Sequence, residues 1–433
     1  NATKLKVQKK NLRDHFKIRA LERYMVNTKR HLNVFNERVE KCIKENDGVF
    51  PDVKDMISPF VLDVLGENLF STEFNSQKVG EPKFVQMVHT LLEISYRAFL
   101  HPWTYFFSNA PLRYLVNFAT IKNAFRPILY FKKSCIKVVK DRYAMMVSEQ
   151  KLADDDEAPA KKAEKSAANT SLLDMMIAER VVQSKLTRVS EIDRQISTFV
   201  IAGHDTTTSS LTWSLYLLGH HQEVQTKLRQ EIDAFTDELR ASSESLTLLN
   251  IKKLKYLDCV IKESLRLYPS GPFIGRRGRQ PVAINDQVTL PANINVIIFI
   301  NYMHTREEYF RQPHRFYPER FLPEKQLEDA DPLRQQSQDG SVWANNSALM
   351  PFSAGLRVCI GKEYGIVQQK LFLINLLSKY TFKAMDTFGE AKPKRFFLLS
   401  SAHFPIKFQP RSDIRPQVVV LNGNGTSKAG EVA

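Results

Sequence analysis

The segment that most constrains this chain is FSAGLRVCIG, which runs from Phe352 to Gly361 and places a single cysteine between two glycines. Gly355 and Gly361 carry no side chain, so the backbone there can turn tightly and lie close to another group. Backbone N–H groups of such a loop can point at a sulfur atom and tune the metal that it binds. We therefore predict that Cys359 is a thiolate ligand and that Phe352 shields it from solvent. The alternative is an ordinary buried thiol, the role of most lone cysteines.

A thiolate on such a loop suits the iron of a haem. Anionic sulfur pushes electron density toward the iron, which favours cleavage of an O–O bond. Arg357 lies two residues before Cys359, so its guanidinium group can reach a haem propionate as a charge-assisted partner.

A second segment, AGHDTTTSS, interrupts a long helical pattern that spans about residues 191–220. Small residues in a helix interior are unfavourable, and a glycine there costs about 1 kcal/mol relative to alanine. Ala202 and Gly203 would let a flat cofactor and a diatomic ligand lie against the helix. A packing glycine is the alternative for Gly203.

Two polar residues follow in the same segment. The Thr206 hydroxyl can bond the Ala202 carbonyl one turn earlier and widen the helix locally. Asp205 beside Thr206 offers an acid–alcohol pair for relaying protons, which makes both candidate catalytic residues. An ordinary polar helix face is the alternative.

A third element pairs Glu263 with Arg266, three residues apart on a helix expected over about residues 254–268. Residues at this spacing share a helix face, and a surface ion pair is the simplest explanation for them alone. The later segment PERF supplies a further cation, Arg320.

These segments resemble the signatures of the cytochrome P450 superfamily. FSAGLRVCIG is similar to its haem-binding loop, and three others are most similar to the animal microsomal branch that includes fatty-acid omega-hydroxylases: AGHDTTTSSLTW, KYLDCVIKESLRLYPSGPFIGR and PERFLPE. The resemblance covers residues 1 to about 410. It implies a mostly α fold with minor β, in which a helical body carries a small β-sheet region, and a single domain over residues 1–410.

The resemblance also implies roles for individual residues. Glu263, Arg266 and Arg320 would form a structural network that holds the loop before the cysteine. Arg276 would bind a haem propionate, with Arg277 as the competing candidate.

Three positions bear on how the haem is held. Lys9 occupies the place of an arginine that is common in the family and could contact a propionate. Leu5 replaces a tryptophan, so one usual haem contact is absent. Some members of the branch carry a glutamate that esterifies a haem methyl at the position of Ala202, so we predict non-covalent haem b.

The chain is basic, with a formal net charge of +15 at pH 7, which fits nucleic acid, an anionic membrane surface or an acidic protein. No zinc-finger spacing or RNA-recognition signature supports nucleic acid. We expect a basic N-terminal cluster to dock an acidic flavoprotein reductase by electrostatic steering, and its members are Lys4, Lys6, Lys9, Lys10 and Arg13. A solvated helix face is the alternative.

Four widely spaced cysteines without a CxxC pair are typical of free thiols in a reducing compartment. The sequence begins at Asn1 rather than at methionine, and no run of about 18 apolar residues is present. We expect a missing natural N-terminus that carries a membrane anchor, and a location on the cytosolic face of the endoplasmic reticulum (microsomal) membrane.

The remaining organisation follows from pattern and composition. Residues 150–170 contain almost no large apolar side chains and predict a flexible loop, and residues 411–433 predict a disordered tail. Residues 281–300, rich in Val and Ile, predict short strands. Helical patterns lie at about 191–220, 222–238, 254–268 and 364–377.

The resemblance implies a monooxygenase that inserts one oxygen atom from O2 into an apolar substrate (a fatty acid, sterol, hormone or xenobiotic). NADPH would supply electrons through cytochrome P450 reductase, with cytochrome b5 as a further partner. One alternative is a haem-thiolate enzyme that rearranges hydroperoxides, but such relatives typically lose the acid–threonine pair that is intact here. The other is a haem-binding protein without monooxygenase activity, which the change at Leu5 keeps open.

Overall fold

The computed structural model describes residues 16–80, 129–146, 148, 171–182, 189–322, 347–395, 399–400 and 404–412. Contacts within the chain divide it into two compact units, and the boundary between them falls inside helix α10 (Val189–His220). The predicted loop at 150–170 and nearly all of the predicted tail lie outside the described residues.

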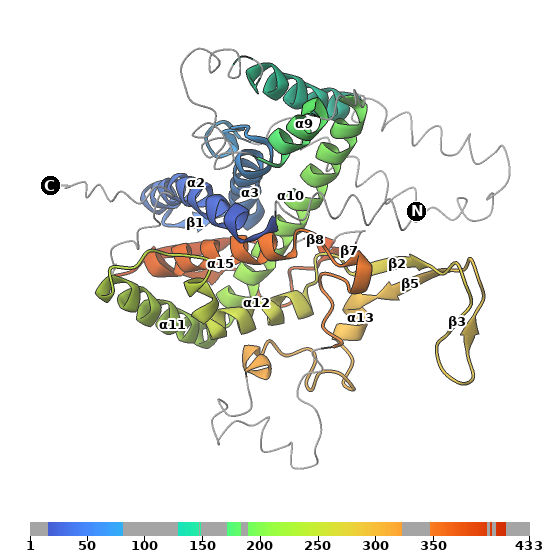
Figure 1. Cartoon of the computed structure of the whole chain (residues 1–433). Coiled ribbons are helices and arrows are strands. Elements are labelled where there is room, and N and C mark those ends of the chain that lie inside the picture. The colour runs from blue at the N-terminus through green and yellow to red at the C-terminus, as the bar shows by residue number, and fades with distance from the viewer. Residues whose placement is uncertain are drawn as a thin grey trace. The chain divides into compact units, whose positions relative to one another are not determined.

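The first unit is helical (Figure 1). Its described elements are α2 (Ile18–Asn46), β1 (Val49–Phe50), α3 (Val53–Phe70), α4 (Ser76–Val79), a helical stretch at 129–146, α9 (Leu172–Val182) and the first part of α10. Helices α2 and α3 pack together, with the rings of Phe35 and Phe60 in an edge contact at 5.6 Å between centroids. Asp52 caps α3 by accepting a hydrogen bond from the Lys54 backbone N–H at 2.9 Å, which satisfies a helix-end donor.

Helix α3 contains Pro59 in its interior. Proline has no N–H, so the carbonyl of Asp55 loses its partner within the helix. The guanidinium group of Arg38, on α2, donates to the carbonyls of Asp55 at 3.2 Å and Met56 at 3.1 Å. A side chain from the neighbouring helix therefore satisfies the acceptor that proline leaves open.

The second unit combines helices with small sheets. Its helices are the end of α10, α11 (Gln222–Ala241), α12 (Lys255–Leu267), α13 (Ile300–His304) and α15 (Lys362–Lys379), with short 3-10 turns η2 (Asn250–Lys253), η3 (Pro318–Phe321) and η6 (Gly355–Arg357). Trp213 of α10 is fully buried and stacks on Tyr268 at 3.7 Å between ring centroids. Aromatic packing of this kind forms the core around α10 in this unit.

Four antiparallel strand pairs complete the second unit. β2 (Phe273–Arg277) pairs with β5 (Asn295–Phe299), with Phe273 opposite Phe299, and the two strands lie side by side in Figure 1. The other pairs are β3 (Val282–Ala283) with β4 (Thr289–Leu290), β6 (Tyr380–Ala384) with β9 (Ile406–Pro410), and β7 (Lys394–Arg395) with β8 (Leu399–Ser400).

The prediction of a mostly α fold with minor β is confirmed, as are helices close to each of the four predicted ranges and strands within 281–300. The predicted start of the tail is slightly early. Arg411 is buried and its guanidinium group donates two hydrogen bonds to the Asp233 carboxylate, at 2.8 and 2.9 Å, so the ordered chain continues past Pro410.

Candidate functional site

The cysteine loop presents its sulfur at a helix start. Cys359 is exposed, and α15 begins three residues later, after Gly361. The Cys359 backbone N–H donates to the Phe352 carbonyl oxygen at 2.9 Å, and the Val358 N–H donates to the Gly355 carbonyl at 3.1 Å. Two backbone hydrogen bonds thus close the loop around an accessible thiol.

The backbone favours glycine at one place in this loop. Gly355 has a φ of +66°, in the left-handed region that side chains rarely adopt. A Cβ added at Gly361 would lie 3.9 Å from the Cys359 sulfur, and one added at Gly365 of α15 would lie 4.0 Å from the Phe352 ring. The half-buried Phe352 ring therefore lies against the first turn of α15 and close to the loop that it closes.

Arg276 reaches the cysteine loop from the sheet. Its guanidinium group donates to the Ser353 hydroxyl at 2.6 Å. Arg276 and Arg277 are successive residues of β2, so their side chains point to opposite faces of the strand. The structure therefore brings Arg276, and not Arg277, to the loop, while Arg357 is exposed within it.

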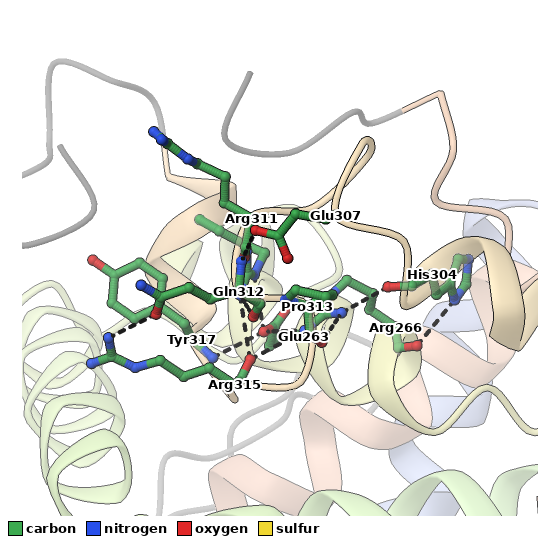
Figure 2. Close-up of polar contacts among 10 residues, drawn as sticks. Glu263, Arg266, His304, Glu307, Arg311, Gln312, Pro313, Arg315 and Tyr317 are labelled. Atoms are coloured by element: carbon green, nitrogen blue, oxygen red, sulfur yellow. Dashed lines mark hydrogen bonds and ion pairs between the residues drawn. The ribbon is translucent and has the colours of Figure 1, made fainter. Parts of the chain in front are cut away.

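The predicted network of Glu263, Arg266 and Arg320 is present, and its side chains are completely buried (Figure 2). The Glu263 carboxylate accepts two hydrogen bonds from Arg266, at 2.7 and 2.9 Å, and one from Arg320 at 3.0 Å. Burial lowers the pKa of Arg320, and the Glu263 carboxylate opposes that shift. Charges removed from water in this way are tolerable only when they are paired and hydrogen-bonded.

The network holds a segment without regular secondary structure. Arg266 donates to the carbonyls of His304, Pro313 and Arg315, and Arg320 donates to those of Arg311 and Gln312. The Tyr317 N–H donates to Glu263 at 2.9 Å. Two guanidinium groups thereby satisfy carbonyls that a helix or sheet would otherwise pair.

His304 links this network to the segment that leads into the cysteine loop, and no sequence pattern predicted this link. Its Nε2 accepts from the Met350 backbone N–H at 3.0 Å, and its Nδ1 donates to the Arg266 carbonyl at 3.1 Å. Burial lowers the pKa of His304 to about 4. The neutral ring is therefore the form that can donate at one nitrogen and accept at the other.

In the first unit, α10 carries the predicted acid–alcohol pair. The Thr206 hydroxyl donates to the Ala202 carbonyl at 2.5 Å, as predicted. Ala202 is exposed. A Cβ added at Gly203 would lie 2.6 Å from a terminal methyl group of Leu65 on α3, so this glycine lets the two helices pack closely with the leucine in its present position. A contact between Gly203 and a cofactor stays a prediction.

Asp205 has a neighbour that sequence reasoning did not identify. One of its carboxylate oxygens lies 2.9 Å from Nδ1 of His204. Nε2 of His204 lies 3.0 Å from the Ser58 hydroxyl on α3. Ser58 and His204 are 146 positions apart, so no local sequence pattern could have paired them. Lys9, Leu5 and the basic N-terminal cluster lie outside the described residues.

The residues of the cysteine loop fit a haem. Beside the exposed thiol, Leu356 and Val358 expose 69% and 38% of their surface, which offers apolar area against which a flat apolar group can pack. Arg276 and Arg357 supply cations suited to the carboxylates of the same group. The apolar surface, the sulfur and the guanidinium groups together match the chemistry of an iron porphyrin.

Comparisons with known proteins agree with this fit. A family model described as Cytochrome P450 matches residues 2–408. Probable cytochrome P450 4d20 of Drosophila melanogaster is 27% identical over 412 residues, covering 93% of this chain and 74% of the fly protein. Cytochrome P450 4V2 of Rattus norvegicus is 28% identical over 380 residues, covering 87% of this chain and 66% of the rat protein.

A solved structure shows the same fold. The haem domain of a cytochrome P450DA mutant superposes with a TM-score of 0.70 at 19% identity, covering 93% of this chain and 77% of that one. The chain thus spans between about two thirds and three quarters of the length of these relatives.

Proposed function

The chain belongs to the cytochrome P450 family, and on that premise we propose that it is a haem-thiolate monooxygenase. It inserts one oxygen atom from O2 into an apolar substrate, and the second atom leaves as water. The observation that best supports this proposal is the exposed thiol of Cys359 near the start of α15. The loop that carries it is closed by a hydrogen bond from the Cys359 N–H to the Phe352 carbonyl. Haem bound through this sulfur supplies the activation of O2.

The cysteine loop prepares the sulfur for that role. The N-terminus of a helix carries a partial positive charge, which favours a thiolate over a thiol. Phe352 would shield the sulfur from water in the haem-bound protein, and the turns at Gly355 and Gly361 would let a macrocycle approach the backbone. Arg276 and Arg357 would hold the propionates. The role of the Glu263 network is structural, since it fixes the segment that His304 joins to the loop.

The α10 segment handles protons. Thr206 donates its own hydroxyl hydrogen to the Ala202 carbonyl, and a hydroxyl oxygen can also accept a hydrogen bond from a partner such as water. Asp205 holds and releases a proton beside it. Ala202 leaves no carboxylate to esterify the haem, which is therefore non-covalent haem b.

The substrate class and partners rest on the relatives. We propose a fatty acid as the first substrate to test, with sterols, hormones and xenobiotics next. Electrons come from NADPH through cytochrome P450 reductase, with cytochrome b5 as an additional donor, and residues 1–410 form one domain on the cytosolic face of the endoplasmic reticulum membrane. Among the described residues, no helix is both long and apolar enough to span a bilayer.

The first experiment is the difference spectrum of the reduced, purified protein with carbon monoxide. A Soret band at the strongly red-shifted thiolate position is expected. Cys359→Ser should abolish that band, whereas Cys259→Ala, at a thiol buried within α12, should keep it. A band at the ordinary histidine-haem position in the unmodified protein would contradict the assignment.

A second measurement separates the enzyme from its alternatives. NADPH consumption that needs reductase, O2 and an added apolar substrate supports monooxygenation. Turnover of a hydroperoxide without reductase would instead support rearrangement. No turnover of either kind would leave haem binding alone. Acid-organic solvent should extract the haem from the polypeptide.

A further inference from the structure

A buried polar chain connects α3 with the acid of α10. Ser58 exposes 3% of its surface and His204 exposes 2%, and the Asp205 side chain exposes 9%. The Ser58 hydroxyl lies 3.0 Å from Nε2 of His204, and Nδ1 of His204 lies 2.9 Å from Oδ1 of Asp205. All three residues belong to the first unit.

Packing alone does not explain a histidine at this position. Beside it, Gly203 and Leu65 bring α10 and α3 into close apolar contact, and an apolar side chain would fill such an interface without polar atoms. A buried imidazole is tolerable there because both of its ring nitrogens find partners. The contacts of His204 with Ser58 and Asp205 therefore distinguish it from a residue that only fills space.

The partners also determine the tautomer. An ionised carboxylate only accepts hydrogen bonds, so Nδ1 must carry the hydrogen that faces Asp205. Nε2 is then an acceptor, and the Ser58 hydroxyl, which can rotate, donates to it. The Ser58 carbonyl is also within 3.3 Å of Nε2, but a carbonyl cannot donate and is the more distant of the two oxygens.

A serine, a histidine and an aspartate in this order also occur in hydrolases, where the serine attacks the substrate. Ser58 is buried inside α3, directly before Pro59, and packs against α10. A substrate carbonyl has no access to such a hydroxyl. The three side chains therefore affect the Asp205 carboxylate, and Ser58 does not act on a substrate.

We propose that His204 is a positioning residue for the Asp205 carboxylate and that Ser58 holds the imidazole in place. The terminal torsion of an aspartate is broad, so a donor on Oδ1 fixes the carboxylate plane and with it the direction of Oδ2. Helix α3 thereby sets the orientation of the acid that relays protons. This inference rests on the proposed function, because it concerns how the proposed relay is held.

Substitution of His204 by Asn or by Gln tests its contact with Asp205 separately from its contact with Ser58. The amide nitrogen of Asn lies where Nδ1 of a histidine lies, and that of Gln lies near the place of Nε2. His204→Asn keeps a donor for Asp205 and loses Ser58, whereas His204→Gln keeps a partner for Ser58 and loses the donor for Asp205. Ser58→Ala removes only the hydroxyl group that contacts Nε2 of His204.

The kinetic readout is the share of NADPH electrons recovered in oxygenated product rather than in hydrogen peroxide. Misplacing a proton-relay group lowers rates by about 10-fold to 100-fold, so His204→Gln should lower the ratio of product to peroxide by about tenfold. His204→Asn should stay within about twofold of the unmodified protein. Equal losses in the two variants, or no loss in His204→Gln, would overturn the proposal.

A spectroscopic readout is independent of turnover. In the reduced carbon monoxide form, which is diamagnetic, the ring nitrogens of His204 can be assigned among the 10 histidines by their loss in His204→Asn. A hydrogen on Nδ1, and a shift of the Nε2 resonance in Ser58→Ala, are expected. A hydrogen on Nε2 with none on Nδ1 would refute the proposal even if the protein proves to be a monooxygenase.

The two readouts distinguish failure of the inference from failure of the proposed function. If the unmodified protein shows the thiolate band and product formation, an unaffected His204→Gln variant overturns the inference alone. If it shows neither, the proposed function fails, and the tautomer, measured in the haem-free protein, which is also diamagnetic, still tests how His204 contacts Asp205. The thiolate band of each variant shows that it has folded.

Discussion

The backbone N–H of Cys359 donates to the carbonyl oxygen of Phe352 at 2.9 Å. Together with the bond from the Val358 N–H to the Gly355 carbonyl, this bond closes the loop that presents the sulfur. It joins the residue that carries the aromatic ring to the residue that carries the thiol, so the chain must reverse between them.

The turn should depend on Gly355, whose φ is +66°. A residue with a Cβ in this region costs about 1–2 kcal/mol. Gly355→Ala should lower the free energy of unfolding by that amount and speed haem loss, although nothing lies within 4 Å of the added Cβ. Denaturant titration of the holoprotein measures the first effect.

Gly275→Ala in β2 is the matched control. An added Cβ there also has open space around it, and the backbone does not have a positive φ. The unfolding free energy of Gly275→Ala should fall by less than about 0.5 kcal/mol, or it should rise, because alanine restricts the conformations of the unfolded chain. Similar losses in both variants would show that the left-handed turn is not the cause.

Glu263→Gln should be strongly destabilising. It leaves the guanidinium groups of Arg266 and Arg320 buried without their carboxylate, which typically costs about 3–5 kcal/mol. The control is Glu308→Gln, at an exposed ion pair with Arg306, where solvent screens the charges and the loss should be much smaller. Thermal unfolding compares the two, and losses of equal size would mean that Glu263 acts as a surface residue.

His304 should make the second unit sensitive to acid. Its pKa is lowered from 6.5 to about 4 by burial, so above pH 6.5 the ring is neutral in both the folded and the unfolded state and has no effect. As the pH falls below 6.5, the unfolded state takes up a proton that the folded state does not. This costs up to about 3 kcal/mol by pH 4.

His304→Gln should remove that dependence. Unmodified protein is expected to lose stability between pH 6.5 and pH 4 more steeply than the variant, so that the difference between their unfolding free energies shrinks with acidification. His314→Gln, at an exposed histidine, should follow the unmodified protein. Parallel curves for His304→Gln and the unmodified protein would contradict the lowered pKa.

The contact of Gly203 with Leu65 can be tested as a pair. Gly203→Ala overpacks α10 against α3, because the added Cβ would lie 2.6 Å from the leucine, and overpacking costs about 1–3 kcal/mol. Leu65→Ala alone leaves a cavity. The double variant should be less destabilised than the sum of the two, by more than about 0.5 kcal/mol in a double-mutant cycle; additive losses would place the strain elsewhere.

Much of the fold followed from sequence because the signals were local. The helix ends at α10, α12 and α15 lie near the predicted positions, since periodicity and helix-breaking residues act over a few positions. The Glu263 pair was predictable for the same reason. Arg320 entered only through the resemblance to a known family.

The contacts that were not predictable join residues far apart in the chain. The sequence around Ser58 and Met350 contains no pattern that predicts a histidine partner, because each contact forms only when two distant segments pack together. The choice between Arg276 and Arg277 likewise needed the face of β2 that meets Ser353. For Gly203, a packing role had been the alternative, and its close approach to Leu65 is consistent with that role.

Pro59 makes the stability of α3 depend on α2. The proline has no N–H to donate to the Asp55 carbonyl, and the donor that replaces it, the guanidinium group of Arg38, belongs to α2. Without α2, that carbonyl would depend on water for its hydrogen bond. Helix α3, which also carries Ser58, is therefore stabilised cooperatively with its neighbour.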